Sequence, residues 1–146
     1  MNFYSNKRIS ASATCTLTAL SFLLLTLLDI IVIESYYRPT GAWSSIWLWH
    51  GIYFILYVGI PILMSLGLRS LIPLSIIIAF TFGIEDTAFY ALQSTLPARY
   101  IGVEILGVWQ PSLATALTFN LFGLILICLF LVTASSYEHR QRHQSI

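Results

Sequence analysis

Long stretches without a charged residue are the feature of this sequence that most limits its fold. Such stretches cover residues 9–28, 51–68, 70–84 and 105–137. A helix that crosses a bilayer core needs about 20 mainly apolar residues. Because unpaired backbone groups are not tolerated in lipid, stretches of this length favour helices. We therefore predict four transmembrane helices, at about residues 13–35, 46–67, 71–93 and 112–134.

The composition also indicates a membrane protein. Of the 146 residues, 58% are hydrophobic and 9% are charged, and the mean hydropathy is +0.83. A soluble domain carries about 25% charged residues, so this chain lacks the side chains that a water-facing surface requires. The net charge of +1 argues against a nucleic-acid partner, which needs a clustered basic face. We predict an all-α polytopic membrane protein in which residues 1–146 form one domain, a compact four-helix bundle in the lipid bilayer.

The basic residues predict the orientation of this bundle. With four spans, five basic residues fall on one side of the membrane: Lys7, Arg8, Arg69, Arg140 and Arg142. The opposite side receives Arg38 and Arg99. Because basic residues concentrate in cytoplasmic segments, we expect both termini to lie in the cytoplasm and the protein to reside in the cell membrane.

The connection between the third and fourth predicted spans is long and contains the stretch YIGVEILGVW, residues 100–109. This stretch is too apolar for a free loop, so we predict a short helix that lies along the outer membrane surface. Exposed segments of this kind are where binding residues concentrate. We therefore interpret the connection as a lid, with Arg99, Glu104 and Trp109 as its candidate residues.

Four ionisable residues lie inside the predicted spans, namely Asp29, His50, Glu85 and Asp86. A charge near the middle of a bilayer costs at least ~2.5–3.5 kcal/mol on insertion scales, so an intramembrane acid marks a candidate functional site. At 1.5 Å of rise per residue, all four residues fall roughly 6–10 Å inside the outer boundary of the membrane. Three predicted helices therefore bring ionisable groups to one layer.

Helical periodicity predicts which of these residues point into the bundle. Asp29 continues a hydroxyl-rich face of the first helix, and Asp86 continues a face of the third helix when residues 71–93 form one continuous helix. Membrane helices turn small and weakly polar faces towards one another. We predict that Asp29, His50 and Asp86 converge in the interior and that Glu85, about 100° away from Asp86, lies beside them. The predicted supporting residues are Tyr53, Tyr57, Tyr90 and Asn120.

Three interpretations of this polar cluster stay open. Carboxylates with one imidazole suit one divalent metal ion such as Zn²⁺, Mn²⁺ or Fe²⁺. Alternatively, a buried acid that keeps its proton at neutral pH exchanges that proton with an apolar substrate or relays it. In the third interpretation, a protonated acid holds neighbouring helices together and has no chemical role.

Two classes of function follow from these interpretations. The first is a small enzyme or binding protein whose outer-layer cluster holds a divalent cation or an apolar substrate. The alternative is a non-catalytic accessory or structural subunit, which associates with other membrane subunits or with copies of itself. The sequence contains no glycine-rich phosphate loop and no HExxH motif, so it does not decide whether the protein is an enzyme.

The predicted topology resembles that of the four-helix EXPERA membrane family, which includes sterol isomerases. The resemblance rests on the aromatic-rich helices and on Asp29 in the segment LTLLDIIV. It implies a four-helix membrane fold and a membrane-embedded aspartate. His50 and the segment GIEDTAFY have no counterpart in that family, so we transfer no sterol chemistry to this chain.

Overall fold

The computed structural model describes residues 10–93, 103–105, 108–110 and 112–144. Its regular elements are, in chain order, α1 (Ala11–Val32), the π-helix η1 (Ile33–Tyr37), α2 (Arg38–Thr40), the 3₁₀ turn η2 (Trp43–Ser45), α3 (Ile46–Leu68), the 3₁₀ turn η3 (Ile72–Leu74), α4 (Ser75–Thr81), α5 (Ile84–Leu92), β1 (Val103–Ile105), β2 (Val108–Gln110) and α6 (Leu113–Gln144).

The described part of the chain contains three helical segments that are long and apolar enough to cross a membrane: Ala11–Thr40, Ile46–Leu68 and Leu113–Glu138. They confirm the first, second and fourth predicted spans. Leucine, isoleucine and valine side chains are exposed on the outward faces, as lipid-facing surfaces require. The protein is thus a helical membrane protein with three spanning helices, or four if the bent pair described below forms one span.

Hydroxyl side chains on α1 are compatible with lipid because they bond to the helix itself. Ser10 caps the helix by accepting a hydrogen bond from the backbone amide of Ala13. Thr14, Thr18 and Thr26 each donate to the carbonyl four residues earlier. All three threonines are buried, so this hydroxyl-bearing face of α1 packs against the other helices.

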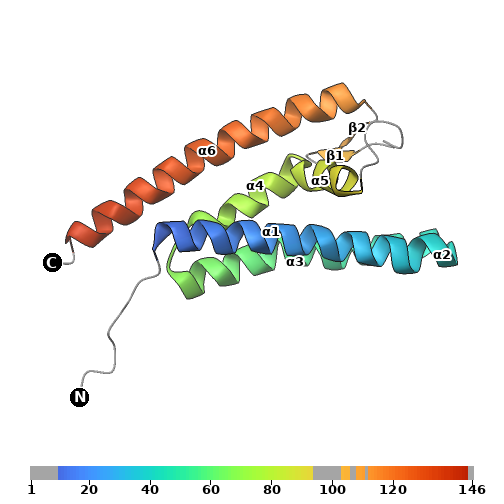
Figure 1. The fold of residues 1–146 in the computed structure, drawn as a ribbon, viewed down its shortest axis with the longest axis horizontal. Coiled ribbons are helices and arrows are strands. Elements are labelled where there is room, and N and C mark those ends of the chain that lie inside the picture. Colours follow the sequence, from blue (N-terminus) through green and yellow to red (C-terminus); the bar gives the residue numbers. More distant parts are fainter. Residues whose placement is uncertain (1–9, 94–102, 106–107, 111, 145–146) are drawn as a thin grey trace, which may run out of the picture.

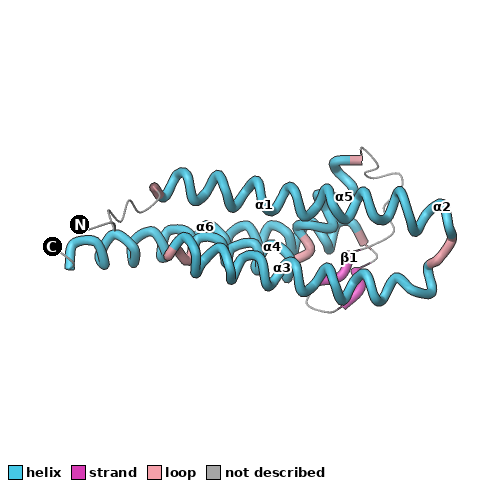
Figure 2. The backbone as a smooth tube through the Cα atoms, turned by 90° about the horizontal axis from the view of Figure 1, so that it is seen from below, coloured by secondary structure: helices cyan, strands magenta, loops and turns pink. Residues whose placement is uncertain are grey.

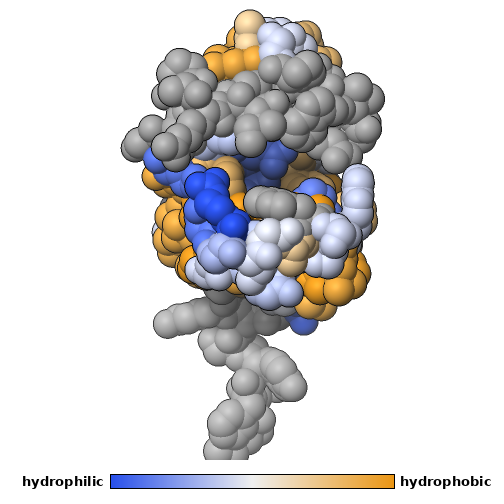
Figure 3. All heavy atoms as spheres, turned by 90° about the vertical axis from the view of Figure 1, so that its right-hand side faces the viewer, coloured by the Kyte–Doolittle hydropathy of each residue, from blue (hydrophilic) through white to orange (hydrophobic). Residues whose placement is uncertain are grey.

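The spanning helices run back and forth between two ends of the molecule (Figures 1 and 2). α1 begins and α6 ends at one end, whereas α2, α5 and the strands lie towards the other. α1 contacts α3 and α5, and α6 packs mainly along α4. Viewed from the α2 end, hydrophilic residues gather on the face and hydrophobic residues border it (Figure 3). This pattern fits an end of the bundle that emerges from the bilayer.

The third predicted span is not one continuous helix. α4 and α5 meet at an angle of 80°, and Gly83 between them adopts the left-handed conformation with φ of 66°. The side-chain amide of Asn120 on α6 donates to the Phe82 carbonyl at 2.9 Å, which satisfies an acceptor at the break. A Cβ atom on Gly123 would lie 2.6 Å from the Phe82 Cβ, so α6 approaches the break closely.

The short interfacial helix that we predicted after the third span is wrong for the residues that the structure describes. Val103–Ile105 and Val108–Gln110 pair as an antiparallel two-stranded ladder, with Glu104 opposite Trp109. β-branched residues dominate these strands, and such residues favour extended backbone over helix. The two residues between the strands lie outside the described part of the chain.

The turn after α3 is closed by the far end of α6. The Glu138 carboxylate accepts hydrogen bonds from the Ser70 hydroxyl at 2.7 Å and from the Leu71 backbone amide at 3.0 Å. Arg69, which ends α3, has a left-handed backbone with φ of 51°. Two successive spanning segments are therefore joined by a tight turn that a third helix stabilises.

Candidate functional site

Glu85 is the most deeply buried ionisable side chain in the described part of the chain. It lies in the first turn of α5, and it is 1% exposed. The Tyr53 hydroxyl, on α3, donates to its Oε1 atom over 2.6 Å. Such a short distance is typical of a strong hydrogen bond to a carboxylate. The contact joins α5 to α3 through one acid and one phenol.

Further hydroxyls continue from this contact towards α1. The Tyr53 and Tyr57 hydroxyl oxygens lie 3.3 Å apart, and the Tyr57 oxygen lies 3.2 Å from Thr26 Oγ1. The Leu25 carbonyl oxygen is also within 3.2 Å of the Tyr53 hydroxyl. We call Glu85, Tyr53, Tyr57 and Thr26 the hydroxyl chain. It links α5, α3 and α1 in the interior of the protein.

Aromatic rings surround the hydroxyl chain. Tyr57 is fully buried, and its ring stacks on Phe80 with the centroids 4.7 Å apart. Phe22 meets the same ring edge-on at 6.3 Å. Leu25 and Ile76 complete this buried cluster. The chain of hydroxyls therefore runs through apolar surroundings, where each hydrogen bond is stronger than it would be in water.

Asp29 lies beside this network on α1. Its Oδ1 atom accepts a hydrogen bond of 2.6 Å from the indole Nε1 of Trp49 on α3. The Asp29 carboxylate also interacts electrostatically with Glu85 and with His50. The structure thus brings the acids of α1 and α5 within electrostatic reach, with each bonded to an aromatic side chain of α3.

The predicted roles of the two adjacent acids are exchanged in the structure. Glu85 is buried, whereas Asp86 is only half-buried and interacts with Glu85. The prediction assumed that the helix continued through Phe82, which would have turned Asp86 inward. Because the backbone reverses into the left-handed region at Gly83, α5 has a different rotation and direction from α4. This break turns Glu85 inward instead.

His50 does not join the acids in the interior, contrary to our prediction. Its side chain is exposed, and its ring packs edge-on against Trp47 at 6.0 Å. The neighbouring residue Trp49 occupies the inward position, which sequence reasoning missed. The available signal was the spacing of Trp49, Tyr53 and Tyr57 at i, i+4 and i+8, which is one face of a helix.

The predicted supporting and lid residues have mixed positions. Asn120 is buried, but it bonds to the Phe82 carbonyl rather than to an acid. Tyr90 packs against Ala116 on α6. Arg99 and the side chains of Glu104 and Trp109 lie outside the described residues, so the lid remains a prediction.

No group of three or more histidine, cysteine, aspartate or glutamate side chains is arranged to hold a metal ion among the residues that the structure describes. Asp29 is occupied by the Trp49 indole, and His50 points outward. The geometry therefore does not support the interpretation of this cluster as a divalent metal site.

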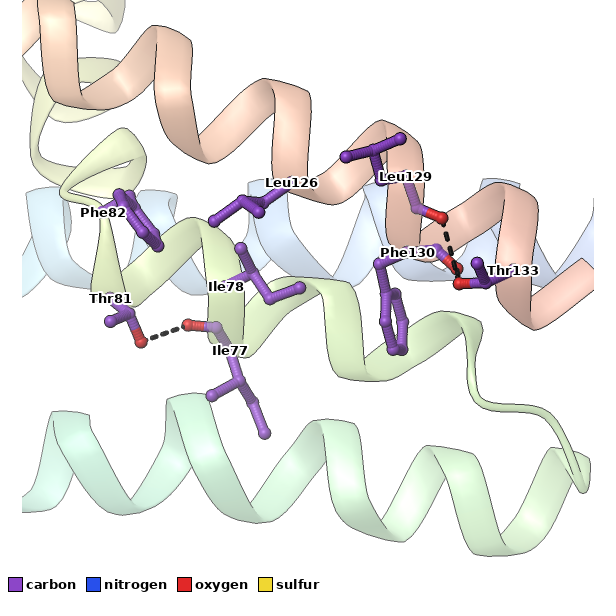
Figure 4. Close-up of a pocket in the computed structure, with 8 residues that line it drawn as sticks. All are labelled: Ile77, Ile78, Thr81, Phe82, Leu126, Leu129, Phe130 and Thr133. Atoms are coloured by element: carbon purple, nitrogen blue, oxygen red, sulfur yellow. Dashed lines mark hydrogen bonds between the residues drawn. The ribbon is translucent and has the colours of Figure 1, made fainter.

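A separate apolar cavity of about 400 Å³ lies between α4 and α6 (Figure 4). Its lining residues are Ile77, Ile78, Thr81, Phe82, Leu126, Leu129, Phe130 and Thr133. Both threonine hydroxyls donate to carbonyls of their own helices. None of the acids lines this cavity, so it is distinct from the hydroxyl chain.

The chain was compared with known proteins at three levels. No protein-family model, no curated protein and no solved structure matches it. What this membrane protein does is therefore inferred from the buried acid and its hydroxyl partners.

Proposed function

We propose that this protein is a proton-binding membrane protein in which Glu85 takes up and releases one proton. The observation that carries the proposal is the burial of this acid, 1% exposed, against the Tyr53 hydroxyl at 2.6 Å. Among the described residues, no cationic side chain forms an ion pair with Glu85. An ionised carboxylate there would be poorly compensated, whereas a neutral acid fits its surroundings. Intramembrane acids with these properties occur in proton relays and proton-coupled carriers.

The hydroxyl chain offers a hydrogen-bond pattern for each protonation state. When Glu85 is ionised, Tyr53 donates to it. When Glu85 carries the proton, it can donate to the Tyr53 oxygen, and the Tyr53 proton then turns towards the Leu25 carbonyl, 3.2 Å away. Both patterns use the same heavy-atom positions, because a hydroxyl both donates and accepts. A relay needs this property, whereas a purely structural contact does not.

The broken span supports the same proposal. Helices that are interrupted within a membrane surround the ion and substrate sites of many carriers. In this protein the break at Gly83 lies two residues before Glu85, at the start of α5. The acid and the irregular backbone thus occupy the same part of the fold.

A second candidate function is an accessory or structural subunit of a membrane complex. The favouring observation is that the polar groups bond within the chain: Asp29 to Trp49, Glu85 to Tyr53, and Asn120 to the Phe82 carbonyl. Bonds of this kind between helices fix their packing. In this case the acid stays protonated at every pH at which the protein remains folded.

Proton release from the purified protein in lipid nanodiscs separates these two functions. We expect the wild-type protein to release one more proton than Glu85→Gln when the pH is raised, and to lose the infrared carbonyl band of a protonated carboxylic acid. Glu34→Gln is the matched control, because Glu34 pairs with Arg38 on α1 and its extension, away from the hydroxyl chain. Equal proton release by wild type and Glu85→Gln, with both folded, would favour the accessory subunit.

We also propose that both termini are cytoplasmic and that the α2 end faces outward. The proposal rests on the excess of basic residues on the side of the termini. A reporter enzyme fused after residue 146 is expected to be active only in the cytoplasm. The same reporter inserted in the 93–103 connection is expected to be active only outside. The opposite pair of results would reverse the orientation.

A further inference from the structure

We infer that α5 is a flap, hinged at Gly83, whose docking against α1 and α3 depends on the protonation of Glu85. The inference rests on the proposed function and adds a movement to it. With the proton bound, α5 occupies the position seen in the structure. When the proton leaves, α5 moves away from the hydroxyl chain and exposes Glu85 to water at the α2 end.

The backbone at Gly83 gives α5 a point of rotation. The helical hydrogen-bond ladder is interrupted there, and α4 and α5 meet at 80°. The φ of 66° at Gly83 is one that glycine adopts without strain. Hinges in proteins consist of a few residues at the ends of elements that absorb changes in backbone angle. α5 can therefore change direction without unwinding α4.

The anchoring of α5 is unusual because it depends on an acid. Glu85 is the one residue of this nine-residue helix that is fully buried. The remaining side chains are half-buried or exposed, as for Leu92 at 48%. Apolar anchors hold at any pH, but a buried carboxyl group is stable in apolar surroundings only in its neutral form. Ionisation of Glu85 thus removes the main attachment of α5.

The groups that face Glu85 strengthen this dependence. Asp29 on α1 and Asp86 on α5 itself both interact with it electrostatically, and Tyr53 and Tyr57 on α3 complete the titratable set. From α6, the side chain nearest to the break that the structure describes is the uncharged Asn120. Because these acids share one sign, proton loss adds repulsion across the contact between α1 and α5.

The test measures the position of α5 directly, by pulsed electron paramagnetic resonance between two spin labels. The labels are placed at Ala91 on α5 and Ile52 on α3, both exposed, after Cys15 and Cys128 have been replaced by serine. In the otherwise wild-type chain we expect the distance to increase by about 5 Å or more as the pH rises, which is the pitch of one helical turn. A reference pair at Leu24 and Leu63 is expected to stay constant.

Glu85→Gln is expected to keep α5 docked at every pH, because its neutral amide preserves the contact. The wild-type chain provides a second check, since the distance change and the loss of the carboxylic-acid infrared band should share one midpoint. A constant distance together with proton release from Glu85 would overturn the flap and leave the proposed function intact. Absence of any proton release from Glu85 would overturn the proposed function itself.

Discussion

Replacement of Tyr57 by alanine is expected to lower the free energy of unfolding by about 3–5 kcal/mol, as for other large aromatic residues removed from well-packed interiors. Tyr57 is 0% exposed, and it contacts Phe80 and Phe22 through its ring and Thr26 through its hydroxyl. Because membrane helices are held together mainly by packing, the cavity left behind is not relieved by the lipid. The substitution removes contacts with α1 and α4 at once.

Unfolding of the protein in mixed micelles, titrated with dodecyl sulfate and followed by circular dichroism, measures this loss. The matched control is Phe54→Ala on the same helix, because Phe54 is 55% exposed and its removal should change the stability little. Tyr57→Phe should have an intermediate effect of about 1 kcal/mol, since it removes only the hydroxyl bonds. Equal effects of Tyr57→Ala and Phe54→Ala would show that this cluster is not the core.

Replacement of Gly123 by alanine is the second substitution with a large expected effect. The added Cβ would lie 2.6 Å from Phe82 Cβ and 3.1 Å from Ile84 Cδ1. Phe82 Cβ is attached directly to the backbone, so the conflict is relieved only if α6 moves away from the break. We expect a loss of stability of about 1–3 kcal/mol, as for other overpacked interiors.

Gly51→Ala on α3 is the control for this prediction, because nothing lies within 4 Å of its added Cβ. Alanine is favoured over glycine inside a helix by roughly 0.5–1 kcal/mol, so this variant should be slightly more stable than wild type. The two glycine substitutions are therefore expected to act in opposite directions in the same unfolding assay. A stabilising Gly123→Ala would mean that α6 does not approach Phe82 as closely as described.

The spans could be predicted from the sequence because the solvent imposes them. Uncharged stretches of sufficient length must become helices in lipid, which accounts for α1, α3 and α6. The break in the third span has no comparable local signal. A single glycine within a helical pattern is usually tolerated. The position of this break also depends on Asn120 and Gly123, which lie on α6 and contact Phe82 across the fold.

The candidate site was predictable in depth but not in rotation. The layer that contains Asp29 and Glu85 follows from counting residues along spans of fixed length. Which side of a helix faces inward depends on about 100° per residue, so one irregular residue is enough to exchange neighbours. Gly83 exchanges Glu85 and Asp86 in this way. On α3, weight given to His50 as an ionisable residue obscured the aromatic face that begins at Trp49.

The contact between Glu138 and the turn after α3 has a consequence for how the chain is made. The acceptor for the Ser70 hydroxyl lies 68 residues later in the sequence, near the end of the last span. During synthesis, α1, α3 and α4 leave the ribosome first, and their turn has unpaired donors at the membrane surface until α6 inserts. Completion of translation and closure of this turn thus coincide. A nascent protein truncated before Glu138 presents an open turn that distinguishes it from a finished one.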